Sequence, residues 1–441
     1  MRYALLLFLG LSGCDVLLDF DTLRHGKHPG DGGMVPTDGG MSSTDASGST
    51  DGGTPQCVPG AGPFFDTQLD VRDVKGPSSM LVADVSGDGR LDIVFGAYDR
   101  NIYVMKNGGG RTFLGPVPHP SGCVAGYNDT LVLGDFDGDG RLDLVAGCDD
   151  APTTNVHEAF LLQGDGAGGF GTPIPFANAP GNATAGVAAD LDHDGHTDVA
   201  LTDYESDGLK IYWGTGKAAS FAAQVPLFVP SGTGPSGIVA AKLGGDDITD
   251  LVVANFAGTF QIVRNLRDAT DEHKFGVDPS DTLAAAGEPV ACAVGHLDAD
   301  TTLDLVGAEV GKTVCTSLGT TGSKTTFPPL TPAGSTFPAP SHLAVGDLNC
   351  DGLDDVVLTH AQLLQDMTEF DRFEIYASSA SGVLTNVFTH QDDHTSAPES
   401  NTVAIGDVDG DGHVDVVIGA VASTGALSSK LRILWGLAAA P

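Results

Sequence analysis

The sequence has few basic residues for its length. Its 441 residues include 21 Lys plus Arg against 58 Asp plus Glu, a formal net charge of −37. A chain without a basic surplus does not neutralise phosphates, which excludes nucleic acid as a partner. Such a charge would also strain a compact fold by self-repulsion unless bound cations neutralise some carboxylates.

Motifs of catalysis and of transition-metal binding are also missing. The sequence has no Gly-x-Ser-x-Gly turn, no Cys-His set, no phosphate-cradling glycine loop before a helix and no Cys-x-x-Cys pair. We therefore do not expect an enzyme. A carbohydrate-active lyase or glycosidase is the alternative, because its acid and base could come from separate repeats and leave no local motif.

Long hydrophobic runs are absent as well, so no transmembrane helix is expected. An apolar stretch at residues 4–11 is followed by Ser12-Gly13-Cys14, the order of a secretory signal with a small-residue cleavage site. Residues 11–14, Leu-Ser-Gly-Cys, resemble the lipobox of bacterial lipoproteins, in which the cysteine is lipidated. We therefore expect a signal peptide at 1–13, lipid on Cys14 and a place in the bacterial cell envelope, at the outer membrane or cell surface. The alternative is an ordinary cleaved signal with an incidental cysteine.

Large apolar residues are almost absent between Pro29 and residue 56, where Gly, Asp, Ser, Thr and Pro dominate. Such a stretch cannot bury a core. We interpret 14–57 as the lipidated cysteine followed by a flexible acidic linker, which leaves 58–441 as the folded part.

Glycine is abundant, at 61 residues, and much of it belongs to one repeated motif. The clearest copy, at 135–143, reads Asp-Phe-Asp-Gly-Asp-Gly-Arg-Leu-Asp and precedes an apolar run. Seven copies follow one another at intervals of 51 to 60 residues and begin at Asp84, Asp135, Asp190, Lys242, His296, Asp347 and Asp407. The chain is therefore one array of repeats.

Each repeat has the pattern of two β-hairpins. Apolar runs on both sides of the motif predict a hairpin with the carboxylates in its turn, and a second hairpin follows in most copies. Four short strands in about 50 residues make one propeller blade. The stretch 64–69 precedes the first copy and resembles a lone fourth strand. We predict an all-β, seven-bladed β-propeller with four-stranded antiparallel blades, closed by this N-terminal strand in the last blade.

The loop residues predict Ca²⁺ sites. In the fullest copies positions one, three, five and nine are Asp, and Gly at position six permits a sharp turn. With the carbonyl of position seven they supply about six hard oxygen ligands, which suits Ca²⁺ better than Mg²⁺. Copies two, three and seven are complete, whereas copies one and six have Ser or Asn at position three. The predicted ligands are Asp84, Ser86, Asp88, Asp92, Asp135, Asp137, Asp139, Asp143, Asp190, Asp192, Asp194, Asp198, Asp347, Asn349, Asp351, Asp355, Asp407, Asp409, Asp411 and Asp415.

Two copies are incomplete, so we expect about five ions. Copy five is a weak candidate with Asp298, Asp300 and Asp304, because it lacks the first oxygen ligand and the turn glycine. Copy four begins with Lys242, whose ammonium group could take the place of the cation. One alternative is that the loops are acidic turns without metal. If ions do bind, we favour ions that only stabilise the hairpins over ions that contact a ligand of the protein.

These loops, and following runs such as Val94-Phe95-Gly96-Ala97, resemble FG-GAP or VCBS-type repeats, the units of the integrin alpha-chain propeller and of many bacterial envelope proteins. The resemblance covers about 84–441 and implies Ca²⁺ loops on one face and partners on the opposite face. It would place on that face Tyr98, Tyr127, His157, Tyr204, Phe256, His360, His390 and His394. The leading hypothesis is a monomeric, lipid-anchored, non-catalytic binding or adhesion module for a protein or glycan. A purely structural envelope module is the further alternative.

Six cysteines are left if Cys14 carries lipid, which suggests disulfides in an oxidising compartment. Six cysteines allow 15 pairings. Two possible pairs each fall within one repeat: Cys123 with Cys148, which is the favoured pair, and Cys292 with Cys315. Cys57 and Cys350 would then be left.

Overall fold

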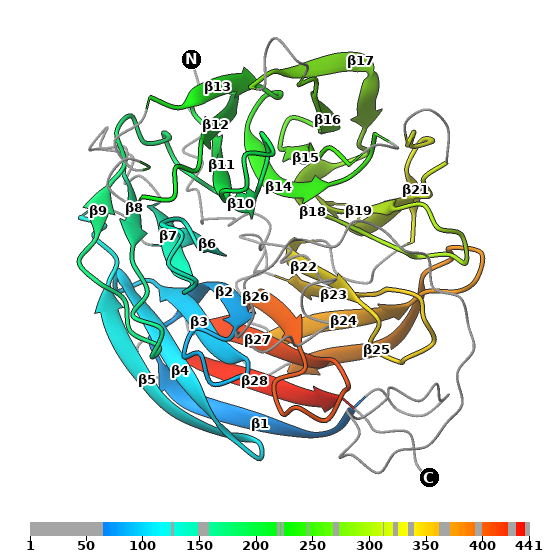
Figure 1. Ribbon diagram of the computed structural model, residues 1–441. Helices are drawn as coiled ribbons and strands as arrows, with labels where there is room; N and C mark the ends of the chain where they lie inside the picture. Colours follow the sequence, from blue (N-terminus) through cyan, green and yellow to red (C-terminus); the bar gives the residue numbers. More distant parts are fainter. Residues whose placement is uncertain are drawn as a thin grey trace, which may run out of the picture.

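The structure is a computed structural model that describes residues 65–436 except 125–127, 149–157, 218–220, 222–224, 245–246, 268–272, 312, 321–324, 334–338, 361–370, 393–398 and 422–428. The described residues form 28 β-strands in seven four-stranded antiparallel sheets. The sheets stand around a common centre (Figure 1). The predicted all-β seven-bladed propeller is thus confirmed, whereas the predicted signal peptide, Cys14 and linker lie outside the described residues.

Each blade places its first strand at the centre of the ring and its fourth strand at the rim. Blade one consists of β2 (Pro77–Ala83), β3 (Asp92–Ala97), β4 (Asn101–Gly109) and β5 (Thr112–Pro120). Blades two and three consist of β6 (Asn128–Gly134), β7 (Asp143–Cys148), β8 (Ala159–Leu162), β9 (Ile174–Pro175), β10 (Gly186–Ala189), β11 (Asp198–Asp203), β12 (Gly208–Tyr212) and β13 (Leu227–Pro230). Blades four and five consist of β14 (Pro235–Ala241), β15 (Asp250–Asn255), β16 (Thr259–Asn265), β17 (Phe275–Ala284), β18 (Glu288–Gly295), β19 (Asp304–Val310), β20 (Thr313–Ser317) and β21 (Thr331–Pro332). Blades six and seven consist of β22 (Pro340–Gly346), β23 (Asp355–His360), β24 (Asp371–Ala377), β25 (Thr385–Asp392), β26 (Glu399–Gly406), β27 (Asp415–Val421), β28 (Ser429–Gly436) and β1 (Phe65–Val74).

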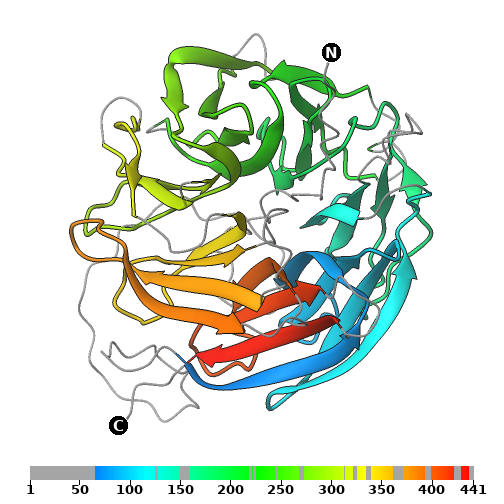
Figure 2. The ribbon, with the colours of Figure 1, turned by 180° about the vertical axis from the view of Figure 1, so that it is seen from behind.

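Blade seven is completed by the start of the described chain. β1 pairs antiparallel with β28, with Leu69 opposite Ile433 and Val71 opposite Leu431. In both views β1 (blue) lies beside β28 (red) at the rim (Figures 1 and 2). The prediction that a strand before the first repeat closes the ring is confirmed.

The second strand of each blade lies in the core. β3, β7, β11, β15 and β23 are buried at every position. A strand that is covered on both faces needs a continuous apolar run, and runs such as Val416-Val417-Ile418 supply it directly after each loop. The fourth strands face water, as Leu114 of β5 does with 64% of its surface exposed. Packed second strands therefore fix one end of every repeat loop.

The ring has two ends, which we call the loop face and the opposite face. The repeat loops join first strands to second strands, so they all lie on the loop face. The turns between third and fourth strands lie there too, and Gly168 of blade two donates its N–H to Val85 O in the loop of copy one. The opposite face carries the turns between second and third strands and the connections between blades. No helix among the described residues has the length and apolarity to cross a membrane.

Candidate metal centres

The aspartate at loop position nine ties each loop to the third strand of its own blade. In copy two, Asp143 accepts hydrogen bonds from the N–H groups of Phe136 (3.1 Å) and Gly164 (2.8 Å). The other copies repeat the bond from the end of the third strand, with Asp92, Asp198, Asp250, Asp304, Asp355 and Asp415 as acceptors. All seven of these aspartates are buried. From the sequence, Asp92, Asp143, Asp198, Asp355 and Asp415 were predicted ligands, Asp304 was a weak candidate and Asp250 was not a candidate. The structural role comes in addition.

The aspartate at position one closes the turn. Asp135 accepts N–H groups from Gly138 (2.8 Å), Asp139 (3.1 Å) and Gly140 (2.9 Å). Gly140 has a φ of +82°, in the left-handed region that glycine adopts most easily. The glycines at position six of four other copies also have positive φ: Gly89, Gly195, Gly352 and Gly412. These bonds account for the glycine at position six.

Three loops bring their carboxylates together. In each, the ligand atoms of three aspartates lie within 4.8 Å of one another. The groups are Asp135, Asp137 and Asp143 in copy two, Asp190, Asp192 and Asp194 in copy three, and Asp407, Asp409 and Asp415 in copy seven. These are the three copies with complete carboxylate sets.

The chemistry of these groups fits a calcium ion. In copy three, Asp190 Oδ1 is buried and has no hydrogen-bond partner among the described residues. Burying such an oxygen costs free energy unless another group satisfies it. All donors in the three groups are hard oxygens, the ligands that Ca²⁺ prefers.

Burial raises the pKa of several position-nine carboxyl groups. The pKa of Asp143 rises to about 6, those of Asp198 and Asp355 to about 7, and that of Asp415 to about 8. Desolvation is the largest cause, and neighbouring loop aspartates raise the pKa values further, whereas backbone N–H donors lower them. A divalent cation would favour the ionised form of the same groups.

Copies one and six keep the same turn with fewer carboxylates. Asp84 accepts the N–H of Gly89 at 2.8 Å, and Asp347 accepts that of Gly352 at 3.0 Å. The described residues form no three-carboxylate cluster in these copies, because position three is a hydroxyl or an amide. The ligands predicted from the sequence are Asp84, Ser86, Asp88 and Asp92 in copy one, and Asp347, Asn349, Asp351 and Asp355 in copy six.

Copy five has an imidazole at position one. His296 Nδ1 lies 3.2 Å from Thr302 O, the position-seven carbonyl that would face a metal. Asp304 keeps its structural bond from Leu297 N–H at 2.8 Å. Asp298 and Asp300 accept N–H groups within the turn, and the described residues of this copy form no three-carboxylate cluster.

Copy four contains a second cation, Arg264, besides Lys242, the one that the sequence suggested. Lys242 Nζ bonds Asp247 at the surface (2.7 Å), and position five, Asp246, lies outside the described residues. The position-nine carboxylate, Asp250, instead accepts a hydrogen bond from Arg264 Nη1 at 2.9 Å. Arg264 also bonds Asp281, and its side chain is 9% exposed. The sequence signal was a basic residue at the end of β16, outside the motif.

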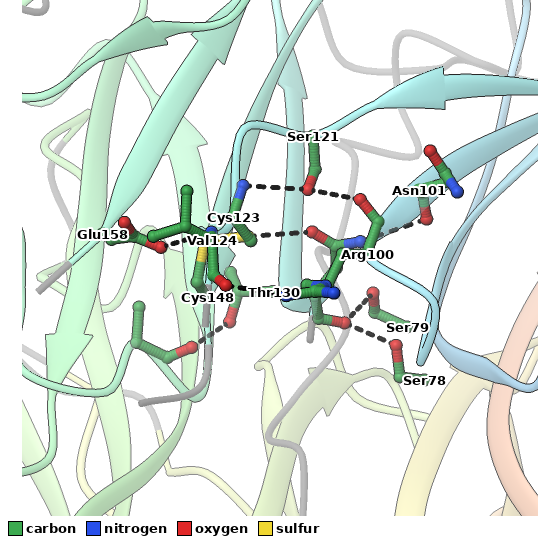
Figure 3. Close-up of a disulfide and its surroundings, with 12 residues drawn as sticks. Ser78, Ser79, Arg100, Asn101, Ser121, Cys123, Val124, Thr130, Cys148 and Glu158 are labelled. Atoms are coloured by element: carbon green, nitrogen blue, oxygen red, sulfur yellow. Dashed lines mark hydrogen bonds between the residues drawn. A yellow bond between two sulfur atoms is a disulfide. The ribbon is translucent and has the colours of Figure 1, made fainter. Parts of the chain in front are cut away.

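A disulfide joins Cys123, in the connection from blade one to blade two, to Cys148 at the end of β7 (Figure 3). Their Cα atoms are 5.9 Å apart, within the usual range for such a bridge. Nearby, Arg100 Nη1 donates to Val124 O at 2.7 Å, and Val124 N–H donates to Glu158. This was the favoured pair, and it fixes a connection on the opposite face.

The pairing suggested for Cys292 and Cys315 is wrong, because both are buried thiols. Gly307 of β19 lies opposite Cys292 of β18 and also opposite Cys315 of β20, so the two cysteines are two strands apart. Two strand spacings amount to roughly 9.5 Å, too far for a disulfide. Cys350 is disulfide-bonded, and Cys57 lies outside the described residues.

The sequence analysis did not recognise that, in several blades, one position near the end of the second strand carries a polar residue or cysteine: the fifth position after the position-nine aspartate. In blade three, Asp203 accepts the N–H of Gly181 from the incoming connection. In blade five, Glu309 accepts the N–H groups of Ala286 and Gly287. Cys148, Asn255 and His360 occupy the same position in blades two, four and six. The chemistry differs from blade to blade, which hides the position from motif searches.

Of the side chains expected on the opposite face, most of those that the structure describes are not exposed. His360 is 2% exposed and lies 3.1 Å from Glu374. His390 lies within β25 with its ring 4.9 Å from that of Phe373, and Tyr204 and Phe256 are half-buried. Tyr98 is exposed, at 38%. The other residues expected there lie outside the described residues: Tyr127, His157 and His394.

Comparisons with known proteins agree with this architecture. A family model described as FG-GAP-like repeat matches residues 84–146 and 190–253. Two solved structures, titled as crystal structures of BBS1N in complex with ARL6DN soaked with mercury or with lead, are similar in fold, with TM-scores of 0.53 and 0.54. They are 11% and 12% identical, and each alignment covers 84% of this chain and 96% of the other. No curated protein matches the sequence. The chain is a seven-bladed β-propeller in which residues 84–146 and 190–253 match FG-GAP-like repeats.

Proposed function

We propose that this chain is an extracytoplasmic propeller of the bacterial envelope, anchored by lipid on Cys14, that binds about five Ca²⁺ ions and acts as a non-catalytic binding module. The observation that supports the metal sites is the convergence of three aspartates within 4.8 Å in each of three loops. The fold is compatible with a binding module, because a closed ring presents loops at two ends. A protein or glycan on the opposite face is the proposed ligand.

The loop residues divide the work of the proposed metal site. Ca²⁺ supplies the positive charge that lets several carboxylates share a small volume. Position-one aspartates shape the turn through backbone N–H bonds, and position-nine aspartates connect it to the third strand. The ions therefore stabilise the fold rather than contact the ligand, in line with metal binding that is coupled to folding.

Elemental analysis and calorimetry test the metal assignment. The chain carrying Cys14→Ser, to avoid lipid, should contain about five calcium ions and lose much of its thermal stability in chelator. Asp143→Asn, Asp198→Asn and Asp415→Asn should each lower the count by about one. A calcium-free chain with the same melting temperature in chelator and in Ca²⁺ would refute the assignment.

Two further measurements test the anchor and the binding role. Mass spectrometry of the full chain made in a bacterium should find a lipid-modified Cys14 as the first residue, and Cys14→Ser should abolish membrane attachment. Capture of envelope components on the Ca²⁺-loaded chain should yield a specific protein or glycan. Release of products from a panel of polysaccharides would instead reveal an enzyme.

A further inference from the structure

The chain has two tryptophans, and both lie beside repeat loops with complete carboxylate sets. Trp213 directly precedes Gly214, whose N–H donates to the position-nine aspartate of copy three. Trp435 directly precedes Gly436, which makes the same bond in copy seven. The two indoles therefore occupy equivalent positions in blades three and seven.

At copy seven, blade one contributes a cation to the loop of blade seven. Arg111, in the turn between β4 and β5, places Nε 2.6 Å from Asp409 Oδ2 and Nη2 3.6 Å from Asp411. Its guanidinium lies 5.0 Å from the centre of the Trp435 ring, and Phe113 stacks on the same ring at 6.5 Å. Trp435 is 3% exposed, whereas the Arg111 side chain is 34% exposed, so the tryptophan side of this contact is buried and the arginine side is partly open to solvent.

The same arrangement recurs at copy three, between blades three and four. His273 Nε2 lies 2.9 Å from Asp192 Oδ2, and its ring lies 4.1 Å from that of Trp213. Phe275, two residues later, stacks on Trp213 at 6.3 Å. The sequence pattern is the same at both junctions. Arg111 or His273 is followed two residues later by a phenylalanine, and both side chains of each pair contact the tryptophan of the neighbouring blade.

An asparagine amide completes each junction. Asn107 Nδ2 donates to Val408 O in the loop of copy seven. Asn265 Nδ2 donates to Leu191 O in the loop of copy three, at 2.6 Å. Both carbonyls belong to loop position two, and each asparagine lies opposite the junction phenylalanine of its own hairpin. The chain has no third tryptophan, so no other loop combines all these contacts.

The aspartate at position three is held from both sides of each junction. Asp409 Oδ1 accepts the N–H of Asp411 at 3.0 Å within its own loop, while Oδ2 accepts Arg111 from the next blade. Asp192 likewise accepts Asp194 N–H through Oδ1 and contacts His273 through Oδ2. A partner that orients a metal ligand in this way commonly affects metal affinity as well.

We propose that copies three and seven are calcium-dependent latches between neighbouring blades, in which His273 and Arg111 position the ligands Asp192 and Asp409. The inference rests on the Ca²⁺ part of the proposed function. Ion binding to these loops and docking of the next blade's hairpin are then coupled, each strengthening the other. The latches lie at the junctions of blades three with four and seven with one (Figure 1). They divide the ring into a half of three blades and a half of four.

Single-tryptophan variants of the chain carrying Cys14→Ser test the latches one at a time. Trp213→Phe leaves Trp435 to report copy seven, and Trp435→Phe leaves Trp213 to report copy three. After chelation, fluorescence titrated with Ca²⁺ should change in both variants. Adding Arg111→Gln should raise the midpoint at copy seven about tenfold and leave that at copy three unchanged. His273→Gln should do the reverse.

Arg100→Gln is the matched control, because it removes the same charge from the opposite face and should leave both midpoints unchanged. Hydrogen exchange provides a second readout: Ca²⁺ should protect residues 107–113 in the parent chain and not in the Arg111→Gln variant. Bound calcium with an unchanged or lower midpoint in Arg111→Gln would overturn the latch, since the guanidinium would then be inert or a competitor of the ion. No bound calcium in the parent chain would overturn both the latch and the metal sites.

Discussion

At the scale of single residues, the position-nine aspartate has two tasks. It connects the loop to the third strand in every blade, including blade four, where Arg264 rather than a proposed ion lies beside it. The ligand pattern of Asp residues could be predicted from sequence because oxygen donors at alternating positions define the site. The structural bonds of Asp250 could not, because their donors lie outside the motif: the Arg264 side chain is 14 positions and the Asn265 N–H 15 positions further along the chain.

The raised pKa values predict how stability in chelator depends on pH. Burial raises the pKa of Asp143 to about 6 and that of Asp415 to about 8, above an unfolded value of about 3.9. Groups with a raised folded pKa contribute stability below the unfolded pKa and lose it as pH rises through the folded pKa. The melting temperature in chelator should therefore fall between about pH 4 and pH 8 and level off above pH 8, and excess Ca²⁺ should abolish the fall. A melting temperature in chelator that rises over this window would contradict the assignment.

Arg264 should be needed whether or not calcium is present. Arg264→Met leaves Asp250 and Asp281 buried without their shared cation, which typically costs about 3–5 kcal/mol. Denaturant unfolding should show similar losses in Ca²⁺ and in chelator. The triple variant with Asp250→Asn and Asp281→Asn should recover part of the loss, because no buried charge then lacks a partner. A loss seen only in chelator would mean that Arg264 acts through the metal sites.

At the scale of elements, the hairpins could be predicted from the sequence, but the side chains that hold the connections between blades could not. Apolar runs flank every motif, so the first and second strands follow from the pattern. The residue that holds the incoming connection is Asp203 in one blade and Glu309 in another. The same position carries Cys148 in blade two. Only the geometry of the blades reveals that these different side chains perform one task.

Among the interactions that hold these connections between blades, the disulfide of blade two should stabilise the fold most. Cys123 and Cys148 close a loop with a sequence separation of 25, for which the entropic account gives about 3.5 kcal/mol. Replacing both cysteines by serine should lower the free energy of unfolding by about that amount, measured by denaturant titration without reductant. Cys292→Ala serves as a control, because it removes a buried thiol and leaves all disulfides intact. An equal loss in both variants would assign the effect to packing rather than to the bridge.

At the scale of the whole molecule, the repeat spacing predicted the number of blades and the closure of the ring. Seven motifs predicted seven blades. The extra strand before the first motif was left to complete the last blade at the C-terminal end. The junctions between blades were not predictable, because Arg111 and Asp409 are separated by 298 positions. Side chains so far apart in sequence carry no local pattern.

Removing β1 should open the ring. Deletion of residues 1–74 exposes one edge of β28 and uncovers Leu431 and Ile433, which pack in the same core cluster as Val74. Loss of the apolar contacts of Leu69, Val71 and Val74 should cost at least about 3 kcal/mol, and the bare edge should promote self-association. Light scattering and thermal unfolding would detect both effects. Deletion of residues 15–56 alone should cause neither, and a monomeric, equally stable variant without β1 would contradict the role of ring closure.

The closure of blade seven also sets the order in which the chain can finish folding. Arg432 Nε bonds Asp70 across a separation of 362 positions, so β1, the first strand that the structure describes, receives its neighbour β28 last. Such distant pairing makes the final step slow. A polypeptide cut short anywhere before β28 keeps β1 as a bare strand, so completeness of synthesis is a condition for reaching the native state.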